Sequence, residues 1–220
     1  FQHLHYYFPE TKDPRIITVT SEVDYRNKVI VTDTIVLIAL DTYLGEDHEF
    51  YGGIQKYLRQ NFSAGQIIPD MANEYAKRYA YQPKKKTLLE EMIYHGKLLY
   101  VKDLVIPFKK EAERIGYSKE QLVWAQENES EIWRYFFDRE LLSSTDSKLP
   151  ARFITPAPFT KVYLEVAAGA PGRLGQSSGW QIVRASMTKN AITMKSMMIA
   201  EADPTCKETR VRQHTERQTQ

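Results

Sequence analysis

Residues 67–81 read IIPDMANEYAKRYAY, and the fold that we expect is organised around this stretch. Pro69 suits the first turn of a helix, where its missing N–H group costs nothing, and Asp70 would lie near the positive end of the helix dipole. Met71 and Tyr75 then recur at helical spacing. The pattern therefore predicts a helix over this whole stretch, with one partly aromatic face.

The centre of that helix, NEYAK at residues 73–77, has the shape of the zinc-peptidase motif H-E-x-x-H with the glutamate kept and both histidines replaced. In a working site the two histidines bind zinc, and the glutamate acts as general base on the metal-bound water. Asn73 and Lys77 occupy the ligand positions here, but an amide binds zinc poorly and an ammonium repels it. We therefore expect no catalytic residue, no metal and no cofactor. The candidate vestigial site comprises Asn73, Glu74, Lys77 and, from the next helix, His95.

Two other interpretations of these residues stay open. In the first, the protein is a metal-dependent peptidase that uses an unorthodox site around Glu74 and His95. In the second, the residues have no site chemistry: Glu74 and Arg78 form an i,i+4 surface pair, Asn73 and Lys77 are solvated, and His95 is half-buried.

A third hypothesis makes the protein a peptide- or glycan-binding module in which tyrosine rings serve as stacking surfaces. The rings in question are those of Tyr75, Tyr79 and Tyr94. Aromatic side chains at helical spacing more often belong to the core, so exposed rings beside a groove would be needed to favour this hypothesis.

Charge and composition exclude several classes of protein. The chain has 220 residues and a net charge of +2, which is too balanced to indicate a nucleic-acid partner. Its one cysteine, Cys206, can form neither an intrachain disulfide nor a cysteine zinc cage. The lysine run at residues 84–86 is typical of a solvated loop, and no apolar run approaches the about 20 residues that span a bilayer.

The order of the expected elements defines the fold class. Residues 15–25 and 29–40 read as strands, the second broken near residues 33–34. These strands need helices to pack against, so we expect an α+β, mostly helical fold with a small N-terminal sheet on a helical body. Residues 1–202 would form a single domain, and residues 203–220 a disordered tail.

The expected helices after the first one are defined by capping signals and prolines. Thr87 with Glu90 and Ser118 with Gln121 are capping boxes, and Thr193 is a further N-cap. The helices run over residues 87–106, 118–142 and 172–189, with a short last one after residue 193, while residues 145–171 read mostly as loop.

Two polar or glycine-rich segments invite site interpretations that we do not adopt. The segment GRLGQSSGW at residues 172–180 does not follow a strand, so we expect closely packed helices there instead of a phosphate site. Four acidic residues lie close together in the sequence: Asp41, Glu46, Asp47 and Glu49. They do not have the spacing of an EF-hand loop, so we expect an acidic turn.

Four segments resemble a known family in order along the chain: IVTDTIVLIALDTYLG, KTLLEEMIYHGKLLYVKDLVIP, GYSKEQLVWAQENESEIWRYF and APGRLGQSSGWQIVRASM. The chain resembles the gliding motility-associated lipoprotein GldB family over about residues 6–202. The resemblance extends distantly to predicted zinc peptidases, and it implies a zincin-like, degenerate metallopeptidase-like architecture for residues 1–202.

The resemblance also implies a location and partners. Proteins of this family are envelope lipoproteins tied to bacterial gliding and its secretion machinery. We therefore expect a lipid-anchored protein that faces the periplasm, with an anchor outside this chain, and envelope proteins of that machinery as partners. Our leading hypothesis is a non-catalytic envelope protein.

Overall fold

The computed structural model describes residues 1–156, 170–190 and 192–201. The chain forms two compact units, Phe1–Arg78 with Val101–Gly116 and Tyr79–Tyr100 with Tyr117–Gln220. The expected mostly helical α+β class is confirmed, while a single domain over residues 1–202 stays a prediction. The expected tail at residues 203–220, with Cys206, lies outside the described residues.

A three-stranded sheet forms the N-terminal part of the first unit. Strands β1 (Arg15–Val19), β3 (Ile35–Ala39) and β2 (Val29–Val31) lie in that order, with β1 parallel and β2 antiparallel to the central β3. The buried side chains Val36 and Ile38 make β3 the apolar centre of one sheet face. The expected break near residues 33–34 is confirmed because β2 and β3 flank it.

The first expected strand is shorter than its β-branched sequence indicates. It ends at Val19, and Glu22 and Val23 have positive φ angles of 55° and 60°. Such angles do not belong to an extended strand, so the expectation of a strand up to residue 25 is wrong. The cause is the carboxylate of Asp41, which accepts hydrogen bonds from the backbone N–H groups of Ser21 and Val23.

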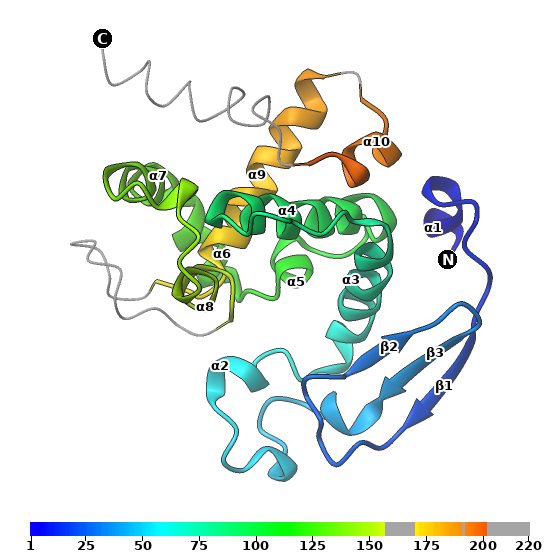
Figure 1. Cartoon of the computed structure of the whole chain (residues 1–220). Helices are drawn as coiled ribbons and strands as arrows, with labels where there is room; N and C mark the ends of the chain where they lie inside the picture. The colour runs from blue at the N-terminus through cyan, green and yellow to red at the C-terminus, as the bar shows by residue number, and fades with distance from the viewer. Residues whose placement is uncertain (157–169, 191, 202–220) are drawn as a thin grey trace. The chain divides into compact units, whose positions relative to one another are not determined.

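Helix α3 (Ile67–Tyr79) confirms the helix expected from the opening stretch. It is tied to the sheet region by ion pairs from Asp70 to Lys28 and from Arg78 to Asp33. Figure 1 shows it beside the strands within the first unit. The other elements of this unit are α1 (Gln2–Tyr7), η1 (Leu40–Thr42), η2 (Glu49–Tyr51), α2 (Lys56–Arg59), η3 (Ala64–Gln66) and α5 (Glu111–Ile115).

Helix α4 (Leu88–Val105) contributes its first part to the second unit and its last residues to the first. The expected capping box is present, since Thr87 N donates to Glu90 at 3.3 Å and Glu90 N donates to the Thr87 hydroxyl at 3.2 Å. The remaining elements of the second unit are α6 (Lys119–Glu127), α7 (Glu129–Asp138), η4 (Leu141–Ser143), α8 (Lys148–Phe153), α9 (Leu174–Lys189) and α10 (Met194–Ile199).

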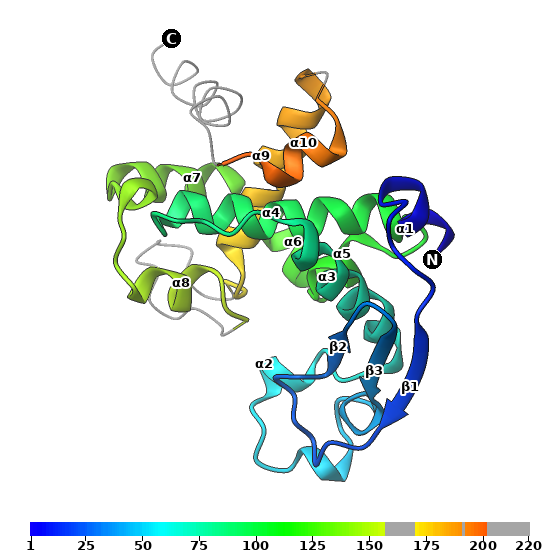
Figure 2. The same ribbon diagram turned by 45° about the vertical axis from the view of Figure 1, so that its right-hand side comes forward.

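Aromatic side chains fill the core of the second unit. Trp133, Phe136, Phe153 and Trp180 are almost completely buried, and the rings of Phe136 and Phe153 meet edge to face at 5.1 Å. Helix α9 crosses α4 in both ribbon views (Figure 1 and Figure 2). This crossing is close enough to depend on glycines.

Two expectations about helices in the second unit are wrong in part. The helix expected over residues 118–142 begins with its capping box at Ser118 but divides at Asn128 into α6 and α7. The segment expected to be loop from residue 145 contains α8, and residues 157–169 of that segment lie outside the described residues. The helix expected over residues 172–189 and the cap at Thr193 are confirmed.

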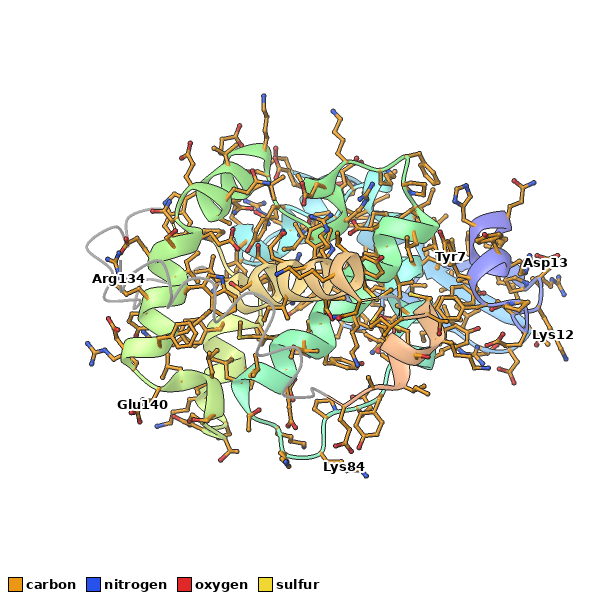
Figure 3. All side chains as sticks on the ribbon, turned by 90° about the horizontal axis from the view of Figure 1, so that it is seen from above. Tyr7, Lys12, Asp13, Lys84, Arg134 and Glu140 are labelled. Carbon is orange, nitrogen blue, oxygen red and sulfur yellow. The ribbon has the colours of Figure 1, made fainter. Side chains whose placement is uncertain are left out.

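Surface features agree with the sequence where the structure describes them. Lys84, Lys85 and Lys86 are exposed in the loop between α3 and α4, and Lys84 points away from the ribbon in Figure 3. Among the described helices, none combines the length and apolar character needed to cross a bilayer.

Candidate functional site on helix α3

The motif-like residues of α3 form a small polar cluster on one side of the helix. Lys77 Nζ lies 2.6 Å from Glu74 Oε1, and Asn73 Nδ2 donates to the same oxygen at 3.4 Å. The side chains of Lys77 and Glu74 are 44% and 30% exposed. The structure therefore brings three of the four candidate residues together, with Asn73 and Lys77 both donating to one carboxylate oxygen of Glu74.

The expectation that Glu74 pairs with Arg78 is wrong. Arg78 pairs with Asp33, near the sheet, instead of with Glu74. Lys77 is then the helix cation within reach of Glu74, at i,i+3 spacing. Because a surface pair of this kind contributes about 0–1 kcal/mol, the pairing matters more for the chemistry of Glu74 than for stability.

The residues of this cluster do not fit a zinc ion. Zinc needs lone pairs from several ligands, whereas the ammonium of Lys77 offers none and adds a positive charge 2.6 Å from the glutamate. Within the described ranges, no three His, Cys, Asp or Glu side chains gather closely enough to hold a metal ion. Lys77 and Asn73 both engage Oε1 of Glu74, so this oxygen is not directed at water as that of a general base must be.

His95 lies on α4, in the second unit, and its half-burial is as expected. Its ring meets that of Tyr94 edge to face at 5.2 Å. The glycine that follows it, Gly96, belongs to the α4–α9 crossing. A joint role for His95 and Glu74 stays a prediction.

The first turn of α3 carries a second polar cluster that the sequence reading missed. Asp70 Oδ2 accepts hydrogen bonds from Lys28 Nζ and, at 2.8 Å, from the Tyr43 hydroxyl. Lys28 also lies over the rings of Tyr43 and Phe62, at 5.0 and 5.6 Å from their centroids. Burial raises the pKa of Tyr43, and the charge of Asp70 raises it further, so the phenol stays protonated and acts as a donor.

A signal for this cluster was present in the sequence. Tyr43 belongs to the segment LDTYLG at residues 40–45, and Asp70 is the acidic residue expected in the first turn of α3. Their meeting could not be deduced, because it depends on how η1 and the strands before it pack against α3.

Asp41 of the same segment points inward instead of joining an acidic turn. Its carboxylate accepts hydrogen bonds from the backbone N–H groups of Ser21 at 2.8 Å and Val23 at 2.9 Å. It is 9% exposed, whereas Glu46, Asp47 and Glu49 are on the surface. The four acidic residues therefore do not act as one group.

The tyrosines proposed as stacking surfaces are mostly core residues. Tyr75 and Tyr94 are 3% and 9% exposed, and Tyr79 is half-buried. Burial of this kind agrees with their helical spacing and does not favour the binding-module hypothesis.

The glycine-rich segment at residues 172–180 serves close packing, as expected. A Cβ atom on Gly179 would lie 1.9 Å from the Met92 carbonyl oxygen, and one on Gly96 would lie 2.3 Å from the Gly179 oxygen. The two helix backbones thus touch at glycines, and at this crossing no space remains between them for a phosphate group.

Taken together, the fold and the site define a class: a mostly helical α+β protein whose helix α3 has a zinc-peptidase-like sequence with amide and ammonium groups at the ligand positions. A family model described as gliding motility protein GldB matches residues 1–209. The chain belongs to this family.

Membership in the family gives the protein its broad setting. The GldB family is a lipoprotein family with a role in gliding motility, and its members belong to the cell envelope. Searches of curated protein sequences and of solved structures returned no match. The zincin-like architecture therefore stays a prediction.

Proposed function

We propose that this protein supports gliding motility as a non-catalytic envelope component that acts through protein interactions. Its partners are envelope proteins of the gliding and secretion machinery, and it faces the periplasm. The family supports the setting, and the geometry of α3 supports the absence of catalysis.

The ion pair between Lys77 and Glu74 is the observation that carries the proposal. A general base needs a lone pair directed at water, but the Glu74 oxygen nearest the helix cation accepts from Lys77 at 2.6 Å. Lys77 stands where the motif has its second zinc-binding histidine, and its ammonium thus neutralises the charge of Glu74. On this reasoning Glu74 is a surface carboxylate and the helix is a scaffold.

A gliding assay on cells that carry Glu74→Gln tests this proposal. The matched control is Glu131→Gln, because Glu131 also forms an exposed i,i+3 pair, with Arg134 at 2.7 Å on α7. Arg134 points outward in Figure 3, as an exposed partner should. We expect both variants to glide at the wild-type speed, with unchanged protein levels in the envelope.

The peptidase alternative predicts a different result. It requires Glu74→Gln to abolish gliding while Glu131→Gln does not, and the purified chain to retain near-stoichiometric zinc that Glu74→Ala or His95→Ala loses. Elemental mass spectrometry of the dialysed protein measures this zinc directly. Either finding would overturn the proposal of a non-catalytic protein.

A further inference from the structure

A cavity of about 380 Å³ lies within the first unit, apart from the polar cluster of α3. It is open to solvent on one side and is lined by α1, by residues 68–75 of α3 and by residues 105–108. Cavities that bind small molecules measure about 300–1,000 Å³, and an engineered apolar cavity of about 150 Å³ already binds benzene. The volume is therefore sufficient for an organic ligand.

The lining of this cavity is mostly apolar, and its polar members are Gln2, His3 and Tyr75. Ile68, Met71 and Ala72 contribute from α3, Leu4 from α1, and Val105 and Ile106 from the end of α4 and the residue after it. Among the described residues that line it, none is Lys, Arg, Asp or Glu. The buried part of a ligand should therefore be uncharged, because in the part of the chain that the structure describes no lysine, arginine or acidic side chain lines the cavity to compensate the desolvation of a charge.

The backbone around the cavity indicates what kind of apolar ligand fits. The walls formed by α1 and α3 are helical, so most of their N–H and C=O groups already bond within the helices. An extended peptide inserted between them would leave its own backbone groups without partners, at a cost of about 1–3 kcal/mol for each group. A hydrocarbon chain carries no such groups.

Two aromatic side chains mark the open side of the cavity. Phe1 and Phe108 line it while remaining 41% and 67% exposed. The Phe1 ring meets the buried Tyr75 ring edge to face at 5.9 Å, which holds it in place. A chain can thus enter past the rings while its polar end stays in water.

We propose that this cavity binds the acyl chain of a membrane lipid, with the head group outside. The envelope setting of the family places the protein where such chains are abundant. This inference does not depend on whether α3 is catalytic.

Fluorescence titration with cis-parinaric acid, below its micelle concentration, tests the inference on the delipidated full chain. We expect saturable binding of about one equivalent, displaced by a short-chain phospholipid. Met71→Trp places a large side chain in the cavity and should weaken binding at least tenfold. Val123→Trp on α6 is the control, because Val123 is 41% exposed and belongs to the second unit, and it should bind as the wild type does.

Three results would overturn the inference. They are non-saturable binding, equal binding by wild type and Met71→Trp, and displacement by a hydrophobic peptide but not by the phospholipid. If Met71→Trp fails to fold, as judged by circular dichroism, Ile68→Phe serves as the second cavity-filling variant. We expect Ile68→Phe to weaken binding of cis-parinaric acid at least tenfold as well.

Discussion

At the scale of single residues, Asp41 shows how a carboxylate can fix the backbone of a distant loop. Glu22 and Val23 adopt positive φ angles, which cost energy for residues other than glycine. Asp41 offsets that cost by accepting from the Ser21 and Val23 N–H groups and from the Ser21 hydroxyl. The strand therefore ends where the carboxylate lies, and not where the β-branched residues end.

Asp41→Asn should lower the free energy of unfolding by about 1.5–3 kcal/mol at pH 7, the range for hydrogen bonds to a charged group. The amide has one acceptor oxygen, and its NH₂ group would face backbone donors. Urea unfolding followed by circular dichroism measures the loss. The control is Asp47→Asn on the surface nearby, which should change stability by less than about 0.5 kcal/mol.

The pH dependence of the difference in unfolding free energy between wild type and Asp41→Asn gives a second readout. Burial alone raises the pKa of the Asp41 carboxyl, but the hydrogen bonds from Val23 and Ser21 outweigh burial and hold the pKa below 3.8. The stabilisation is thus fully present above the unfolded-state pKa and is lost as the pH falls through the lower folded-state pKa. A gap between wild type and Asp41→Asn that persisted unchanged at pH 2 would contradict this account.

Residue-scale features were predictable from the sequence only where partners are close along the chain. The capping pairs Thr87 with Glu90 and Ser118 with Gln121 lie within one helical turn, so spacing alone identified them. The contacts of Asp41 and Asp70 join residues separated by 18 to 42 positions. The same holds for Arg78, which pairs with Asp33, 45 positions away, and not with Glu74 one turn earlier.

At the scale of elements, the crossing of α4 and α9 depends on two glycines. The Cβ positions of Gly96 and Gly179 are occupied by backbone atoms of the other helix, which cannot move as a flexible side chain can. The segment GRLGQSSGW predicted a close approach, because small residues in a helix permit one. The partner helix was not predictable, since many helices could have met this face.

Gly179→Ala should destabilise the protein by about 3 kcal/mol or more, because overpacking against backbone forces the two helices apart. A loss of stability is diagnostic here, because alanine in an ordinary helix interior is more favourable than glycine by about 1 kcal/mol. Gly52→Ala is the control, as its added Cβ would meet only the Glu49 carbonyl oxygen at an ordinary 3.5 Å. Thermal unfolding of the two variants measures the contrast, and a Gly179→Ala variant as stable as Gly52→Ala would contradict the close crossing.

Helix breaks were harder to predict than helix starts. Asn128 has φ −98° and ψ 13°, outside the helical region, and its side chain donates to the Trp124 carbonyl at 2.8 Å. That bond competes with helix continuation between α6 and α7. The amphipathic pattern continues across the break, so periodicity alone indicated one long helix.

At the scale of the whole molecule, the chain passes between the two units three times, after Arg78, after Tyr100 and after Gly116. The second of these passages lies inside α4, so one helix belongs to both units. Helix formation is cooperative along a continuous segment, because each residue added to an existing helix gains a hydrogen bond. Melting one unit would therefore fray a helix that the other unit needs.

We accordingly expect the protein to unfold in one transition, with equal calorimetric and van't Hoff enthalpies. Asp41→Asn alters the first unit and Gly179→Ala the second, yet each should shift the same transition, by about 2–4 °C for each kcal/mol lost. Differential scanning calorimetry on the three proteins makes the comparison. Two transitions, with each variant lowering only one of them, would mean that the units are separate domains and that α4 is a linker between them.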